Sequence, residues 1–181
     1  MFDITTSGDF YAMLVQDFDD FMAEQHSSRR ALHCAITAYH LGQWVWRDWL
    51  KDDHVVKKVL GISSENSFYN WINQTCVWFA PVRDLTNGTK HFNQNQSFGT
   101  IRIHGGPLGL GPSGQGCLLI DYGEGAGELH RFQPVAHLLE IVVRFWRDFF
   151  WKYRPNMDLP ESRYHVDGDW AMRDNKVDAG D

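Results

Sequence analysis

The segment from Pro134 to Tyr153 constrains the fold most, because apolar side chains surround nearly the whole helix that it predicts. The apolar residues recur at helical spacing and are Leu138, Ile141, Val142, Phe145, Trp146, Phe149 and Phe150. A narrow polar stripe interrupts them, formed by Glu140, Arg144, Arg147, Asp148 and Lys152. A helix with so little polar surface must be buried on most sides. We therefore expect other helices to pack around it.

Further helices are predicted upstream of this segment. The first begins near Ser7 or Asp9, with one apolar side (Phe10, Leu14, Phe18 and Phe21) and three acidic residues that face away (Asp17, Asp20 and Glu24). The others span about 27–51, 54–60 and 67–92, with Asp53 capping the third helix and Gly61 ending it. Because proline has no amide hydrogen, we expect a break or kink at Pro81.

Between residues 97 and 132 the apolar residues no longer recur at helical spacing but alternate with polar ones. The segments 98–104 and 117–123 are predicted strands joined by a glycine-rich loop, and 128–132 is a third candidate. The expected fold is mainly α: a helical bundle with a small antiparallel β-hairpin or three-stranded sheet inserted before the last long helix. We expect one domain over 1–171, with the β insertion at about 97–132. The polar residues 172–181 are expected to form a flexible tail.

Charge and cysteine usage narrow the function classes. The formal net charge is −6, so no broad basic surface for duplex DNA is expected. No apolar run approaches bilayer length, the first residues lack a signal-peptide pattern, and Cys34, Cys76 and Cys117 are widely separated. These features predict a soluble, cytoplasmic protein with reduced thiols and no membrane partner.

The aromatic content has two interpretations. Aromatic residues make up 14% of the chain and include eight tryptophans, which can either fill a core or form a binding surface. On the second interpretation, helix 28–51 and the last helix present aromatic residues to a second copy or to another protein. The working hypothesis from sequence is therefore a non-catalytic interaction module, with self-association or a protein partner.

One polar stripe lies on the predicted helix 28–51. His33, Thr37, His40 and Trp44 follow one another at four- and three-residue steps, so they share a face. Arg29, Arg47 and Lys51 lie on the same stripe. Because the rest of this helix is apolar, the stripe faces either water or a cleft. His33 and His40 are its candidate ligand-binding residues.

A second polar stripe is RDLTNGTKHF, residues 83–92. Asp84, Asn87 and His91 stand at i, i+3 and i+7, with Arg83 and Lys90 beside them. Histidine can act as an acid, a base or a metal ligand near neutral pH, while lysine and arginine can hold an anion. The candidate catalytic residues are thus His91, Asn87 and Asp84, and the candidate anion ligands are Arg83 and Lys90. The alternative is an ordinary solvated helix face.

Joining the two stripes gives a metal hypothesis. Imidazole and carboxylate groups suit divalent ions such as Zn²⁺ or Fe²⁺, so His33, His40, His91 and Asp84 could share one ion if the two helices face each other. The ligand spacing matches no established metal motif, and no cofactor is assigned from sequence.

Two resemblances rest on these segments. AYHLGQWVW and RDLTNGTKHF resemble segments of a set of small bacterial helical proteins without an established activity, which implies a shared fold. The second segment also resembles the HEPN domains, helical bundles that often dimerise and sometimes cleave RNA. Their motif is an arginine and a histidine separated by four to six residues, whereas seven residues separate Arg83 from His91 here. This resemblance implies RNA as a substrate, His91 as the acid or base, and Arg83 and Lys90 as phosphate contacts.

Overall fold

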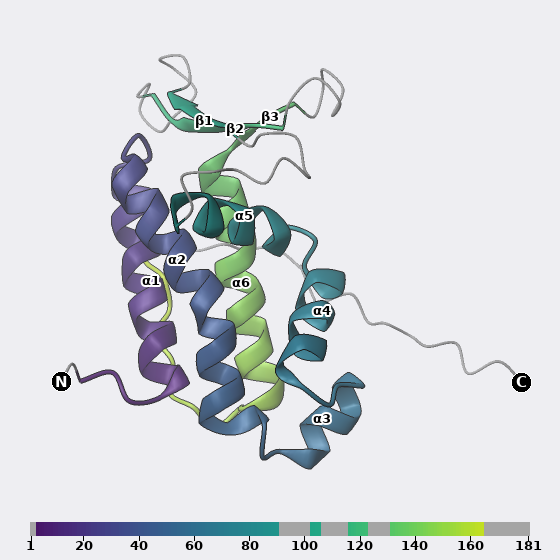
Figure 1. The fold of residues 1–181 in the computed structure, drawn as a ribbon. Helices are drawn as coiled ribbons and strands as arrows, with labels where there is room; N and C mark the ends of the chain where they lie inside the picture. Colours follow the sequence, from purple (N-terminus) through teal and green to yellow (C-terminus); the bar gives the residue numbers. More distant parts are fainter. Residues whose placement is uncertain (1–2, 91–101, 106–115, 123–130, 165–181) are drawn as a thin grey trace, which may run out of the picture.

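The computed structural model describes residues 3–90, 102–105, 116–122 and 131–164, with the side chains of 88–90 and 102–105 outside that description. It confirms a mainly helical fold with a small sheet placed before the last long helix (Figure 1). In chain order the elements are α1 (Ser7–Ala23), α2 (Ser28–Val45), the π-helix η1 (Trp46–Leu50), α3 (His54–Leu60), α4 (Glu65–Thr75), α5 (Phe79–Lys90), β1 (Arg102–Gly105), β2 (Leu118–Asp121), β3 (Phe132–Pro134) and α6 (Val135–Tyr153).

Helix α1 begins at Ser7, one of the two residues near which the sequence predicted its start. Thr6 is the N-cap, and its hydroxyl accepts a hydrogen bond from the Asp9 amide at 3.1 Å. The Asp9 carboxylate accepts from the amides of Thr5 (3.0 Å) and Thr6 (2.9 Å), which completes a capping box. Because these amides stabilise the charged form, they lower the pKa of Asp9 to about 2. Asp9 is therefore the third residue of the helix rather than its cap.

The predicted helix 27–51 is helical throughout but changes its winding near its end. From Trp46 to Leu50 the turn widens into a π-helix, and the Lys51 amide donates to the Trp46 carbonyl at 3.0 Å. A wider turn rotates the following side chains relative to a continued α-helix. The widened turn carries Asp48, whose carboxylate accepts hydrogen bonds from the amide (2.8 Å) and hydroxyl (2.7 Å) of Ser7. This contact fixes the end of α2 against the start of α1.

The break expected at Pro81 occurs earlier. Helix α4 ends at Thr75 and α5 begins at Phe79, so the interruption falls on residues 76–78. Pro81 is the third residue of α5, where a backbone amide has no partner within the helix. The missing proline amide therefore costs α5 no hydrogen bond.

The inserted sheet has three antiparallel strands in the order β1-β2-β3. Ile103 pairs with Ile120, which in turn pairs with Gln133. The third strand, at 132–134, shares Phe132 with the expected segment 128–132, of which residues 128–130 lie outside the described part of the chain. It continues directly into α6, and Pro134 is the N-cap of that helix. Residues 91–101, 106–115 and 123–130, which include the glycine-rich loop, lie outside the described residues, as does the expected tail.

Helix α6 contacts α1, α2, α5, β2 and β3, as its apolar surface requires (Figure 1). Trp146 is fully buried, and its Nε1 donates a hydrogen bond to the Ala38 carbonyl of α2 at 2.9 Å. Its ring meets Phe79 of α5 edge-on, with centroids 6.0 Å apart. Phe145, Phe149 and Phe150 are buried as well. Most aromatic residues of α6 therefore form the core and are not accessible to a partner, whereas Trp151 is 50% exposed.

The three cysteines are buried free thiols. Burial raises the pKa of Cys76 to about 11 and that of Cys34 well above its usual value, because a thiolate loses its hydration in the core. Within the described part of the chain, every helix is too short or too polar to cross a membrane.

Candidate functional site

The polar stripe of α2 lies against α1. The Thr37 hydroxyl donates to the Asp17 carboxylate of α1 at 2.6 Å, and the Trp44 ring stacks on Phe10 with centroids 4.8 Å apart. Asp17 had been expected to face away from the bundle, and this hydrogen bond corrects that expectation. Two members of the stripe thus serve helix packing, while His33 is exposed and His40 is half-buried.

Helix α5 packs on a different side of α2. Its buried residues Phe79 and Val82 point into the core, and the Thr86 hydroxyl donates to the carbonyls of Val82 (2.9 Å) and Ala35 (3.3 Å). Ala35 and Thr37 are two residues apart, which is about 200° around a helix. The contact with α5 and the contact with α1 are therefore on opposite sides of α2.

The polar residues of α5 remain near the surface. Arg83 and Asp84 are half-buried and pair with each other, with 2.9 Å between a guanidinium nitrogen and a carboxylate oxygen. Asn87 is exposed, and both the Lys90 side chain and His91 lie outside the described residues. Among the side chains that are described, no three His, Cys, Asp or Glu residues come together as a metal site would require. The stripes of α2 and α5 thus do not face each other, and the roles given to His91 and Lys90 stay predictions.

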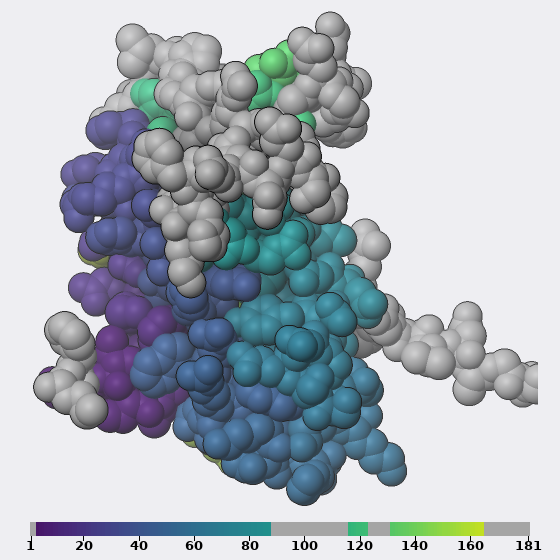
Figure 2. Space-filling view, in the orientation of Figure 1, coloured from purple at the N-terminus to yellow at the C-terminus, as the bar shows by residue number. Residues whose placement is uncertain are grey.

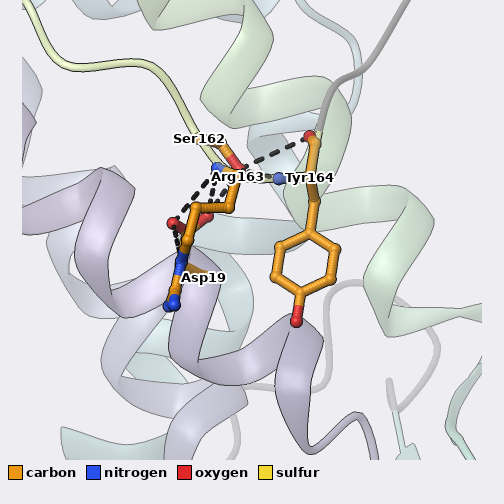
Figure 3. A network of polar contacts seen from close by, with 4 residues as sticks. All are labelled: Asp19, Ser162, Arg163 and Tyr164. Carbon is orange, nitrogen blue, oxygen red and sulfur yellow. Dashed lines mark hydrogen bonds and ion pairs between the residues drawn. The ribbon is translucent and has the colours of Figure 1, made fainter.

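A buried carboxylate that the sequence did not single out lies on α1. Asp19 has a side chain only 9% exposed, and it binds the segment that follows α6 (Figure 3). Its carboxylate accepts hydrogen bonds from the Ser162 hydroxyl at 2.5 Å, the Arg163 amide at 3.2 Å and the Arg163 Nε at 3.0 Å. The hydrogen bond and the negative charge of Asp19 raise the pKa of Arg163. We call these three residues the Asp19 latch.

The latch holds an extended segment, residues 157–164, which we call the C-terminal strap. At its start, the Met157 methyl group lies 2.4 Å from where a Cβ on Gly8 would be, so a larger residue at position 8 would require the Met157 side chain to shift. Gly8 and Asp19 are eleven residues apart, which corresponds to about three full helical turns plus 20°. Both residues therefore lie on the same side of α1. Leu159 also packs against the core. The strap therefore follows one face of α1, and it is visible in Figure 1 as the yellow segment beside that helix.

Sequence reasoning missed the latch because its parts are 143 residues apart. One signal was available: Asp19 directly follows Phe18, a core residue on the apolar side of the predicted first helix. A second was the alternation of Met157 and Leu159 between Pro155 and Pro160, which is typical of an extended segment that packs on a surface. Neither signal indicates that Asp19 and the segment after α6 contact each other.

An apolar surface that the structure leaves open lies on α3. Val55 and Val59 are 74% and 67% exposed, and they stand four residues apart on one side of the helix. The other side is anchored by the buried residues Leu60 and Ile62. Helix α3 projects at the lower end of the molecule in the views of Figures 1 and 2. We call Val55 and Val59 the α3 face.

The charges around the α3 face are segregated along the helix. Asp52 and Asp53 precede the helix, and the Asp53 carboxylate caps it by accepting from the Val56 amide at 2.9 Å. Lys57 and Lys58 lie in the last turn, before Gly61 ends the helix with a positive φ of 67°. Each end thus carries the charge that favours the helix dipole. Lys51 also lies at the N-terminal end, with its Nζ 4.0 Å from an Asp52 carboxylate oxygen. The two exposed valines therefore stand between an end with charges of both signs and a basic end.

Comparison with protein-family models, with curated proteins and with solved structures found no match.

Proposed function

We propose that this chain is a non-catalytic interaction module that associates with a second copy of itself through the α3 face. The exposure of Val55 and Val59 is the observation that supports this function. The capped helix α3 holds these two apolar side chains one turn apart, so they form a small apolar surface with a fixed shape. Covering that surface would remove both valines from water, which is favourable.

The charge pattern favours a second copy as the partner. In a twofold contact the same surface meets itself, and two α3 helices lie antiparallel when the twofold axis is perpendicular to them, which is the arrangement we propose. The acidic residue Asp52 of one copy would then lie near Lys58 of the other, and the two pairs would be equivalent. A patch with one sign of charge would repel itself, whereas this surface is self-complementary.

The association is expected to be weak. A seven-residue helix offers far less area than the roughly 1,200 Å² that stable interfaces bury, so we expect a dissociation constant on the order of 0.1–1 mM. Such an affinity fits a module that associates when copies are concentrated by a shared partner or surface.

Sedimentation and light scattering at increasing concentration of the full chain test the proposal. Wild type should form a dimer at high concentration, and Val55→Asp/Val59→Asp should stay monomeric. Val77→Asp is the matched control, because Val77 is a valine outside α3 with 65% exposure. Equal masses for all three proteins at about 1 mM would contradict the proposal.

A charge exchange tests the antiparallel arrangement. Lys58→Glu should weaken the dimer, because it would place two negative charges opposite each other. Asp52→Lys combined with Lys58→Glu should restore association, since it reverses both partners of the pair. If the double variant is as weak as the single one, the two residues do not meet and the arrangement is wrong.

A further inference from the structure

We propose that Asn87 is a spontaneous modification site, at which deamidation converts the side-chain amide into a carboxylate. Water is the only co-reactant, and ammonia is the leaving group. The site belongs to the polar stripe of α5, and none of its residues lies in α3. The inference therefore does not depend on the proposed self-association.

The residue that follows Asn87 is the first support. Gly88 has no Cβ, so its backbone nitrogen is less shielded than that of any other residue type and can approach the Asn87 side chain closely. Glycine also weakens a helix, because it has more backbone freedom to lose. No other asparagine in the sequence precedes a glycine. Asn87 is thus the asparagine whose neighbour least hinders attack by the backbone.

The place of Asn87 in the fold is the second support. Thr86 is buried, and its hydroxyl donates to the Ala35 carbonyl of α2, which holds α5 against its neighbour up to this residue. Asn87 is exposed, and its side chain has no hydrogen-bond partner among the residues that the structure describes. It also lies in the last turn of α5, which ends at Lys90. The Asn87 amide is therefore accessible to water and is not held in place.

The reaction requires the last turn of α5 to open. In a helix, the Gly88 nitrogen is directed along the axis toward the carbonyl of Asp84, four residues earlier, and away from the Asn87 side chain. Helix ends open at a free-energy cost far below that of global unfolding. Because the last carbonyls of a helix have no partner within it, opening this turn breaks few hydrogen bonds. The modification can thus proceed in the folded protein.

Each step of the chemistry uses only the chain and water. The Gly88 backbone nitrogen loses its proton and attacks the Asn87 Cγ, which forms a new C–N bond. The bond from Cγ to the side-chain nitrogen then breaks, and that nitrogen takes up a proton and leaves as ammonia. Water opens the resulting succinimide ring at either of its carbonyls. The products are aspartate and isoaspartate, in which the main chain runs through Cγ.

Either product changes the end of α5. Both carry a carboxylate that is negatively charged at neutral pH, which is unfavourable near the C-terminal end of a helix. A carboxylate at position 87 also stands one turn from Arg83, where it competes with Asp84 for the guanidinium. Isoaspartate adds a methylene group to the main chain, so a regular helix cannot continue through it. We expect α5 to end near Thr86 in the modified protein.

Ageing of the full-length protein tests the proposal. Wild type is kept in warm neutral buffer, digested with trypsin at intervals and analysed by liquid chromatography and mass spectrometry. Trypsin releases residues 84–90 as one peptide, in which Asn87 is the only asparagine. Synthetic peptides with aspartate or isoaspartate at position 87 identify the two products.

Asn70 is the internal control, because it is exposed but lies in the middle of α4 and precedes Trp71. Opening the middle of a helix costs more than opening its end, so we expect Asn87 to deamidate at least about tenfold faster than Asn70. A smaller ratio of the two rates would overturn the proposal.

The variant Gly88→Ala keeps Asn87 but adds a Cβ beside the attacking nitrogen and favours the helix. We expect it to slow deamidation at position 87 by at least about tenfold. The variant Asn87→Gln should leave the mass of the 84–90 peptide unchanged during ageing, because a glutamine must close a larger ring. An unchanged rate at position 87 in Gly88→Ala would show that attack by this backbone nitrogen is not the route.

Discussion

Helices α6 and α3 are both rich in apolar residues, yet the protein encloses one and displays the other. In α6, ten residues are buried, including Trp146, Phe149 and Phe150. In α3, only Leu60 is buried, while Val55 and Val59 are exposed. The difference arises from the number of neighbours. Helix α6 has helices and the sheet around it, whereas α3 follows η1 at one end of the molecule.

This contrast separates two uses of apolar surface. Side chains enclosed in a core contribute to the free energy of unfolding of the single chain. Exposed side chains contribute little to folding but become available for association. Substitutions in α6 should therefore lower stability, and substitutions on the α3 face should change the oligomeric state.

The largest expected effect is in the core. Trp146→Ala should lower the free energy of unfolding by about 3–5 kcal/mol, because it leaves a cavity and removes the hydrogen bond to Ala38. Urea denaturation followed by circular dichroism measures the change. Trp151→Ala is the control on the same helix: Trp151 is 50% exposed, so a loss within about 1 kcal/mol is expected. Similar losses for the two variants would contradict the core assigned to α6.

The latch should have an intermediate effect. Asp19→Ala should lower the free energy of unfolding by about 1–2 kcal/mol, mainly through the hydrogen bonds of the Ser162 hydroxyl and the Arg163 amide. The ion pair with the Arg163 side chain adds little, because that side chain is 73% exposed. Limited proteolysis should also cut the strap sooner in this variant. An unchanged cleavage pattern would show that Asp19 does not retain the strap.

The α3 face should have almost no effect on folding. Val55→Asp/Val59→Asp should change the free energy of unfolding by less than about 0.5 kcal/mol at each position, measured at dilutions where the chain is monomeric. A loss comparable to that of Trp146→Ala would mean that these valines belong to the core. The comparison between the two helices would then fail.

The smallest effect concerns the start of α1 and its dependence on pH. The capping amides lower the pKa of Asp9 from 3.8 to about 2, so the folded state binds this proton less readily than the unfolded chain does. The charged Asp9 therefore stabilises the folded state fully above the pKa of Asp9 in the unfolded chain, and this stabilisation is lost as the pH falls toward 2. Asp9→Asn should therefore flatten the decline of unfolding free energy between pH 4 and 2. Identical acid profiles would exclude this contribution.

Local sequence signals predicted those elements that depend on nearby residues. The capping of α3 by Asp53 and its end at Gly61 are confirmed, because both involve contacts within one or two helical turns. The described strands overlap the expected segments, but alternation could not indicate which residues pair, since register depends on the partner strand as well. The break before α5 was misplaced because a proline is tolerated in the first turn of a helix.

The candidate site could be predicted only in part. Periodicity placed His33, Thr37 and His40 on one stripe of α2, but it could not identify the helix that this stripe would meet. The structure shows that Thr37 meets Asp17 of α1. A polar residue on a helix has the same sequence pattern whether its partner is water, a ligand or another helix.

The sequence by itself determined the mainly helical class and the need to enclose α6, because periodicity and apolar content are local properties of the chain. Only the tertiary structure decided which apolar residues remain exposed and which distant residues meet. Asp19 and Arg163 are 144 residues apart, and their contact depends on the direction in which the chain leaves α6. Folding brings such pairs together through the packing of whole helices, which no short segment encodes.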